Sequence, residues 1–393
     1  MDTLAERLAA SVAELVRIPS VNPLHTGPIS DEHGAGGEAA IARHLADRFH
    51  ALGASEVVLD DIVDGRPNVY GFFPGRTERL VVLDVHTDTV TVEHMTDPPF
   101  DGRVDDGRVW GRGALDTKAS LGVITTLLDT WQREGARPEP TLLVVGTIAE
   151  EAGGFLGAAR FRQWADDRGL DIDQMIVAEP TQLAPLHGHK GAAALRVTAV
   201  GESAHSALPH LGRNAIEAMA PVITAVQREH ERLQALEPTT ELGNGTVSVT
   251  MIEGGTGSNV IPDACTIMIG RRVVPGEDGH QVFTDLADLA TEACPLPVQI
   301  EPASPPGPDG RLGTDAFYQP PDARLVSDLA TWAGTAPTVA PFGTNALRYS
   351  GFAREIAVFG PGAIDAAHQA TESVAIDDLV ATAEVFTRWL DPA

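Results

Sequence analysis

The feature that most constrains the fold is a series of short, continuous apolar runs that alternate with helical patterns in the first half of the chain. Three such runs lie at 80–85, 141–145 and 174–178. Helical patterns lie between or beside them, at 37–52, 117–133 and 155–168. Apolar strands that alternate with helices are typical of a parallel sheet buried on both faces. This half of the chain therefore predicts an α/β fold, with a mostly parallel sheet sandwiched by helices.

The pattern changes after about residue 186. A segment at 194–200 alternates apolar and polar residues, as a half-exposed strand does. It is followed by a helix at 212–235, strands at 246–253 and 265–273, a helix at 278–293 and an extended segment at 297–301. This order is typical of a small two-layer domain. We therefore expect a catalytic domain formed by 1–186 and 302–393, with an α+β domain inserted at 187–301.

Composition excludes several classes of protein. The formal net charge of −27 argues against nucleic acid or an anionic membrane as a partner. The first twenty residues have the pattern of an amphipathic helix that ends near Pro19, and not that of a signal peptide. Cys265 and Cys294 offer neither a disulfide framework nor a cysteine-type zinc site. A cytoplasmic protein that does not associate with membranes is the simplest interpretation.

Two candidate metal ligands directly follow predicted strands. His86 comes after the run at 80–85, and Glu179 comes after the run at 174–178. Ligands of open α/β sheets bind beyond the carboxyl ends of the strands, so both residues are well placed to hold a metal ion. Asp88 could hold the His86 imidazole in one tautomer. A His-x-Asp motif alone is weak evidence for a metal site, because chance matches to it are common.

Further carboxylate and imidazole groups occur at similar positions. Asp116 lies in a Gly-rich turn before a helix, where the alternative role is a helix N-cap. Glu150 and Glu151 follow another strand, and His368 follows the last predicted one. Adjacent residues of an extended segment point to opposite sides, so one glutamate can bind metal while the other acts as a general base. Helix caps and solvated loops do not readily explain all of these groups together.

These segments, taken in order, resemble a known family. The matching segments are HTDTV at 86–90, GRGALDTK at 111–118, AEEAGG at 149–154, AEPT at 178–181 and AHQ at 367–369. They are similar to the motifs of the co-catalytic zinc deacylase/peptidase family, which includes deacetylases, desuccinylases, aminoacylases and carboxypeptidases. The resemblance spans nearly the whole chain. It implies a di-zinc exopeptidase-like catalytic domain with an inserted lid and dimerisation domain.

The resemblance also implies roles for the candidate residues. Five of them would hold two zinc ions, which cobalt can replace: His86 and Glu179 one ion, Glu151 and His368 the other, with Asp116 bridging both. Glu150 would be the general base for a hydroxide held by the two ions, and Asp88 would orient His86. The peptide bond after Asp116 is expected to be cis.

The inserted domain resembles that of the same family. The matching segments are GESAHS at 201–206, GRNAI at 212–216, GSNVIP at 257–262 and RVVP at 272–275. They imply a homodimer through residues 187–301, in which His205 reaches the active site of the neighbouring subunit and stabilises the oxyanion. Asn259 and Arg272 would bind the substrate carboxylate, since a guanidinium pairs with it in a bidentate fashion. The x-x-Pro that follows favours Arg272 over Arg271.

The sequence specifies the substrate less closely than it specifies the metal ligands. The segment GPGAIDAAHQATESV at 360–374 is most similar to the acetylornithine deacetylase branch. Asn345, a candidate substrate-binding residue, stands where that branch typically has an acidic residue. If that acid recognises the basic side chain of ornithine, its absence argues against specificity for ornithine. We predict a hydrolase that removes the acyl group from an N-acylated amino acid. The alternatives are a carboxypeptidase or dipeptidase acting on a short peptide, a desuccinylase-like enzyme, and a non-catalytic binding protein. The last is disfavoured because every candidate ligand and Glu150 are present.

Overall fold

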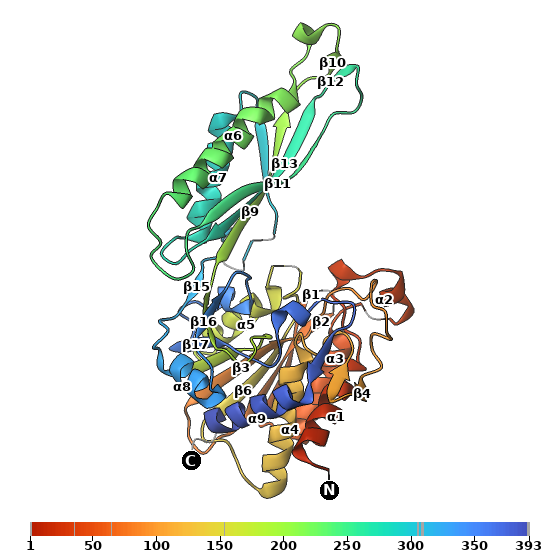
Figure 1. The fold of residues 1–393 in the computed structure, drawn as a ribbon, viewed down its shortest axis with the longest axis vertical. Coiled ribbons are helices and arrows are strands. Elements are labelled where there is room, and N and C mark those ends of the chain that lie inside the picture. Colours follow the sequence, from red (N-terminus) through yellow and green to blue (C-terminus); the bar gives the residue numbers. More distant parts are fainter. Residues whose placement is uncertain are drawn as a thin grey trace. The chain divides into compact units, whose positions relative to one another are not determined.

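The computed structural model describes residues 2–390 apart from 35, 64, 153, 305, 308 and 309. The chain divides into two compact units (Figure 1). The first unit comprises Met1–His187, Gln319–Thr338 and Thr344–Ala393, and the second comprises Gly188–Tyr318 and Val339–Gly343. The segment 302–318, predicted to belong to the catalytic domain, thus groups with the second unit.

The first unit is built on a mixed sheet with a parallel centre, as predicted. The strand order is β1-β2-β6-β3-β7-β17-β8-β15, and β16 pairs with β8. The parallel central strands are β6 (Thr141–Thr147), β3 (Leu80–His86), β7 (Ile172–Val177) and β17 (Glu355–Val358). The outer strands are β1 (Glu56–Val63), β2 (Arg66–Phe73) and β8 (Leu186–His189). β8 and β16 (Thr338–Ala340) each span a boundary between the units, and β15 (Phe317–Tyr318), the last strand of the order, groups with the second unit. Since the central strands run in one direction, their carboxyl ends lie along one edge of the sheet.

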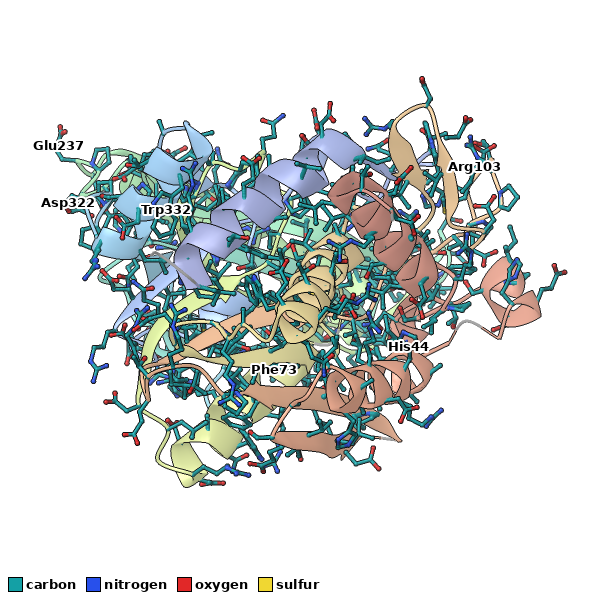
Figure 2. The ribbon with its side chains drawn as sticks, turned by 90° about the horizontal axis from the view of Figure 1, so that it is seen from below. His44, Phe73, Arg103, Glu237, Asp322 and Trp332 are labelled. Carbon is teal, nitrogen blue, oxygen red and sulfur yellow. The ribbon has the colours of Figure 1, made fainter. Side chains whose placement is uncertain are left out.

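Helices cover both faces of this sheet. One face carries α1 (Leu4–Val16), α3 (Ala39–Ala51), α4 (Lys118–Glu134), α8 (Arg324–Ala333) and α9 (Ile376–Leu390), whose buried side chains join one apolar cluster. Figure 2 views this helical layer from below, with His44 on α3 and Trp332 on α8. Side chains of a strand alternate between faces, and Tyr70 of β2 points away from this layer. It contacts Phe161 of α5 (Leu156–Asp167), at 5.4 Å between ring centroids, so α5 covers the opposite face.

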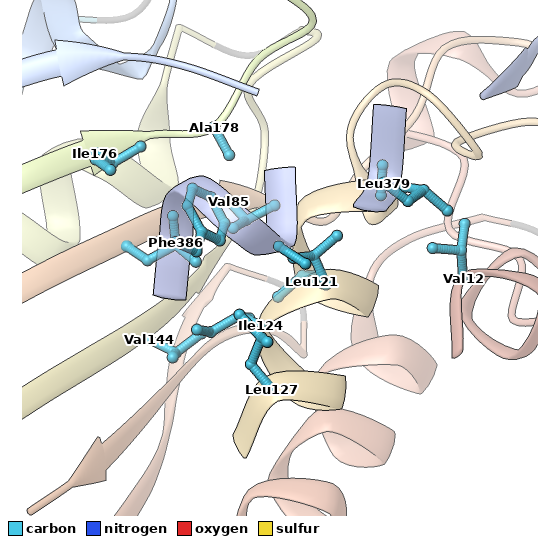
Figure 3. Close-up of a cluster of buried hydrophobic side chains, with 14 of the residues drawn as sticks. Val12, Val85, Leu121, Ile124, Leu127, Val144, Ile176, Ala178, Leu379 and Phe386 are labelled. Atoms are coloured by element: carbon cyan, nitrogen blue, oxygen red, sulfur yellow. The ribbon is translucent and has the colours of Figure 1, made fainter. Parts of the chain in front are cut away.

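The large apolar cluster fixes the sheet to its helices (Figure 3). Val85 of β3, Leu121 of α4 and Phe386 of α9 belong to it, and all three are 0% exposed. Phe386 also contacts the rings of Phe359 and Trp389, with centroids 6.3 and 6.0 Å away. Helix α9 is therefore part of the core of the first unit.

Replacing Phe386 with alanine is expected to lower the free energy of unfolding by about 3–5 kcal/mol, because the buried ring leaves a cavity. Urea unfolding of the purified variant measures this loss. The control is Leu24→Ala, whose side chain is 71% exposed and whose effect should stay within about 0.5 kcal/mol. Equal effects in the two variants would show that α9 is not part of the core.

The second unit is a two-layer α+β structure. Its antiparallel sheet has the order β11-β13-β9-β14, formed by Thr246–Gly254, Ala264–Val273, Gly191–Val200 and Val298–Pro302. Two helices, α6 (Ala215–Gln234) and α7 (Gly279–Ala293), join its apolar cluster. Asn214 caps α6 by accepting hydrogen bonds from the N–H groups of Ile216 and Glu217, which is why this helix begins later than the predicted residue 212. A short ribbon of β10 (Ala204–His205) and β12 (Val260–Ile261) completes the unit.

Smaller elements complete the first unit. These are α2 (Pro28–Glu32) and a three-stranded sheet of β18 (Ser373–Ala375), β5 (Arg108–Trp110) and β4 (Arg103–Asp105). Among the described residues, we find no helix with the length and apolar character needed to span a bilayer.

Candidate metal centre

The candidate ligands gather where the parallel strands end. His86 is the last residue of β3, and Glu179 lies two residues beyond the end of β7. Glu151 follows β6, whose last residue is Thr147. Asp116 lies just before the first residue of α4, and His368 follows β17. The topology thus brings together side chains that are far apart in the sequence.

The first ligand group consists of His86, Asp116 and Glu179, with candidate ligand atoms all within 4.8 Å of one another. His86 Nε2 lies 3.0 Å from Asp116 Oδ1. All three residues are buried, with exposed fractions of 5% or less. Glu179 Oε1 has no hydrogen-bond partner among the described residues. A buried carboxylate oxygen that lacks a protein partner is well suited to bind a cation.

The second group consists of Asp116, Glu151 and His368. His368 Nε2 lies 3.1 Å from both Asp116 Oδ2 and Glu151 Oε2. Asp116 therefore belongs to both groups and presents one oxygen to each histidine. The peptide bond between Asp116 and Thr117 is cis, as the resemblance predicted.

The electrostatics of the cluster favour cations. Burial, followed by the charge of Glu150, raises the pKa of Glu179 well above its ordinary value. Burial and the charge of Asp116 raise the pKa of Glu151 to about 7. Hydrogen bonds to Asp116 and Glu151 raise the pKa of His368 to about 10. Without a metal ion, protons must therefore neutralise the concentrated negative charge. Imidazole nitrogens and carboxylate oxygens in this number suit two divalent ions of the zinc type, so the residues fit the predicted metals.

Glu150 interacts electrostatically with His86, Glu151 and Asp116, which belong to the two ligand groups, but it is a member of neither group. Glu150 is partly buried, and the desolvation of its carboxyl group raises its pKa well above the ordinary value, although the charge of His86 opposes this shift. A carboxylate with a raised pKa accepts and returns a proton near neutral pH more readily than an ordinary one. Its chemistry therefore matches that of the predicted general base.

The contacts of Asp88 show how His86 and the loop that carries Glu150 and Glu151 are fixed in position. His86 Nδ1 lies 2.9 Å from the main-chain oxygen of Asp88 and 3.7 Å from its carboxylate. The carboxylate accepts hydrogen bonds from the N–H groups of Glu150 and Glu151, each at 3.1 Å. Asp88 thus contacts His86 most closely through its main chain, while its side chain holds the loop that carries both glutamates.

Other buried residues, which no sequence pattern indicated, support the same loop. Asn22 is 0% exposed, and its Nδ2 donates to Asp88 Oδ2 at 2.8 Å and to the oxygen of Ala152 at 2.9 Å. Glu38 accepts two hydrogen bonds from Arg66 and one from the N–H of Ala149. These residues precede the ligands by many positions and follow no predicted strand, so only the tertiary structure identifies them.

Asn345 is hydrogen-bonded to β3 and β6, the strands that precede the ligands His86 and Glu151. It is 1% exposed, and its Nδ2 donates to Asp84 Oδ2 and to Thr147 Oγ1, both at 2.9 Å. Burial raises the pKa of Asp84, two residues before His86, to about 6. The acid expected at position 345 is thus absent, but Asp84 supplies a carboxylate next to the asparagine. Its amide nitrogen is engaged in this way, whereas its Oδ1 has no hydrogen-bond partner among the described residues, so the substrate-binding role of Asn345 stays a prediction.

The remaining predicted residues lie in the second unit and are exposed. His205 and Asn259 are held together because the N–H of Ser206 donates to the oxygen of Asn259, at 2.9 Å. His205 Nδ1 accepts from the N–H of Ala207, which leaves Nε2 as the protonated nitrogen. Arg272 is exposed, whereas the neighbouring Arg271 is 4% exposed and paired with Glu277 at 2.5 Å. Arg272 is therefore the more accessible of the two arginines, and its role in substrate binding stays a prediction.

Comparisons with known proteins identify similar chains. Residues 187–296 match the family described as Peptidase dimerisation domain, and residues 68–232 match Peptidase family M28. The chain is 30% identical to an acetylornithine deacetylase of Myxococcus xanthus, over 98% of this chain and 97% of the relative. It is 28% identical to a probable carboxypeptidase of Aspergillus clavatus, over 81% of this chain and 75% of the relative.

Solved structures share the fold at lower identity. A tripeptidase from Staphylococcus aureus is 20% identical with a TM-score of 0.75, over 99% of this chain and 98% of that one. An M20 family metallo-carboxypeptidase from Sulfolobus solfataricus is 17% identical with a TM-score of 0.74, over 99% of both chains. A Bacillus subtilis protein described as a dinuclear metal binding peptidase from the M20 family is 14% identical with a TM-score of 0.65, over 98% of this chain and 96% of that one.

Proposed function

Because this chain belongs to the M20 peptidase family and is a metal-dependent hydrolase of amide bonds, we propose that it removes the acyl group from an N-acylated amino acid. The observation that carries the proposal is the pair of ligand groups that share Asp116, with the partly buried Glu150 close enough to interact with the charges of both. The similarity to an acetylornithine deacetylase over almost the whole chain supports a deacylase.

We propose zinc as the native metal, with His86, Glu179 and Asp116 holding one ion and Glu151, His368 and Asp116 the other. When bound, the two ions polarise the substrate carbonyl and increase the acidity of water. The protein contributes the geometry. Asp88 fixes the loop of Glu150 and Glu151 through their main-chain N–H groups, so the base and the ligand keep their relative positions.

Glu150 acts as the general base in this proposal. Its carboxylate takes a proton from the attacking water and passes it to the leaving nitrogen as the amide C–N bond breaks. The products are a carboxylic acid and a free amine, so protons balance over the cycle. Removal of water from around this partly buried carboxylate increases its proton affinity, consistent with the raised pKa of Glu150.

Recognition of the amino-acid carboxylate is assigned to Arg272 and Asn259. The guanidinium of Arg272 is exposed and offers a planar pair of donors. A substrate that lacks the α-carboxylate is therefore expected to bind more weakly.

A substrate panel tests the proposal. The protein, reconstituted with zinc or cobalt, is assayed on N-acetyl amino acids, N-succinyl amino acids and dipeptides. We expect the highest kcat/KM on an N-acetyl amino acid. Preference for dipeptides would favour the carboxypeptidase alternative. The similarity to a probable carboxypeptidase supports that alternative. Metal binding without turnover of any compound would favour a binding protein.

A homodimer through the second unit is also part of the proposal. Residues 187–296 match the dimerisation family, and β11 lies at an edge of its sheet. Met251 and Ile252 on this strand are 66% and 60% exposed, and Ile216 on α6 is 42% exposed. An exposed apolar edge strand is a surface that pairs readily with a second copy. His205 of the partner subunit would then supply the donor that stabilises the oxyanion.

Replacing His205 with alanine is expected to lower kcat by about 10²–10³-fold, the usual cost of removing one oxyanion donor, without loss of metal. Mixing this variant with Glu150→Gln under conditions of subunit exchange should restore part of the activity. In a mixed dimer, one site has an intact Glu150 and receives His205 from the other subunit. No recovery after verified exchange would show that His205 does not act across the interface.

A further inference from the structure

Arg112 and Glu372 form a buried ion pair outside the two ligand groups. Their side chains are 1% and 0% exposed, and Arg112 Nη1 lies 2.5 Å from Glu372 Oε2. Removing two charges from water is costly, so a buried pair is maintained only when hydrogen bonds satisfy the remaining donors and acceptors. The partners of these donors and acceptors show what the pair holds in place.

The glutamate end of the pair holds the turn that carries Asp116. Glu372 Oε1 accepts hydrogen bonds from the N–H of Leu115 at 3.0 Å and from the N–H of Asp116 at 3.1 Å. The main-chain oxygen of Glu372 accepts from the N–H of Gly111 at 3.0 Å. Both ends of the turn at 111–116 are thus fixed to one residue.

The arginine end reaches the segments that carry the two histidines. Arg112 Nη2 donates to the main-chain oxygen of Gln369, the neighbour of His368, at 3.4 Å. Arg112 Nε donates to the oxygen of Thr91 at 3.1 Å, in the loop that follows His86. One guanidinium therefore contacts the backbone of two segments and the carboxylate that holds the third.

We propose that Arg112 and Glu372 are positioning residues, which hold Asp116 between His86 and His368 so that both metal ions can bind. This inference rests on the proposed function, since it concerns the same metal centre. Hydrogen-bonded partners of ligands orient them and affect metal affinity. A pair that served only to stabilise the fold would change the unfolding of the metal-free protein and leave its metal affinity unaltered.

Two variants that retain charge separate these roles. Arg112→Lys keeps the positive charge, but a single ammonium cannot reproduce the three directed contacts of the guanidinium. Glu372→Asp keeps the negative charge on a shorter side chain. The control is Arg79→Lys, because Arg79 also joins two segments, through Asp173 at 2.8 Å and Glu139 at 3.1 Å, although its side chain is 33% exposed and that of Arg112 is buried. Arg79 precedes β3, at the end of that strand remote from His86.

The readout is the dissociation constant of Zn²⁺, measured in chelator-buffered titrations, together with thermal unfolding of the metal-free proteins. We expect Arg112→Lys and Glu372→Asp to raise the dissociation constant about 10- to 100-fold, and Arg79→Lys to leave it unchanged. The metal-free variants of the pair should still fold and unfold cooperatively, at a lower temperature than Arg79→Lys because the pair is buried.

Unchanged Zn²⁺ affinity in both variants, or loss of the fold in both, would assign the pair to stability and overturn the proposal. A wild-type protein that binds no Zn²⁺ would overturn the proposed function, and the positioning role with it. Normal wild-type binding with unaltered variants would overturn the positioning role alone.

Discussion

Glu150→Gln is expected to lower kcat by about 10²–10⁴-fold, the contribution typical of a general acid–base group, while both metal ions remain bound. Glutamine has the shape of glutamate but cannot accept a proton from water at neutral pH. The main-chain N–H of residue 150 still donates to Asp88, so the loop should keep its conformation. Steady-state kinetics and metal analysis of the same preparation provide the measurement.

The neighbouring residue supplies a matched control. Glu151→Gln changes the same chemical group one position along the chain, but Glu151 is a member of the second ligand group. That variant should lose one metal ion together with its activity. If Glu150→Gln also loses metal, then Glu150 is a ligand; if it retains full activity, the base is a different group.

The sequence predicted the central sheet well, because its strands obey a local rule. The runs at 80–85, 141–145 and 174–178 are apolar on both faces, and the structure places them in β3, β6 and β7. These strands are buried along most of their length. A strand that is buried on both faces consists mostly of apolar residues, so its composition alone is sufficient to predict the strand.

The sequence did not predict β2 (Arg66–Phe73), because this strand lacks a local pattern typical of strands. The strand contains Pro67, Asn68 and Gly71, which a local pattern does not assign to a sheet. Asn68 is 0% exposed, and its Nδ2 donates to the oxygen of Gly157 at 2.8 Å. Gly71 lies against the Phe49 ring, where a Cβ atom would come within 2.6 Å of it. Tertiary contacts make this strand possible, and a sequence read locally does not contain them.

The same distinction applies to the candidate site. The sequence indicated His86 and Glu179 because each follows a strand, and a strand end is a local feature. It did not indicate Arg112, because the role of that residue depends on Glu372 and Gln369 at the far end of the chain. Asn345 is a residue that the sequence did indicate, but only as a candidate for substrate binding. The structure shows that its side chain donates to Asp84, a contact that accounts for an asparagine where an acid is typical.

Asp116→Ala is expected to have the largest effect on the metal centre, because Asp116 is the residue common to both ligand groups. Its carboxylate places one oxygen 3.0 Å from His86 Nε2 and the other 3.1 Å from His368 Nε2. Removing it takes a negative charge and a ligand atom from each group at once. We therefore expect both ions to be lost. Since such ions contribute several kcal/mol of transition-state stabilisation, kcat should fall by about 10³-fold or more.

Glu179→Ala separates a shared ligand from an unshared one. Glu179 belongs only to the first group, so this variant should release one ion and leave the group of Glu151 and His368 able to bind the other. Cobalt titration, followed by visible absorption, counts the ions in each variant, and circular dichroism verifies the fold. One ion retained in Asp116→Ala would mean that the two groups bind independently and that Asp116 does not bridge them. Loss of both ions from Asp116→Ala but only one from Glu179→Ala is the result that a bridging carboxylate requires.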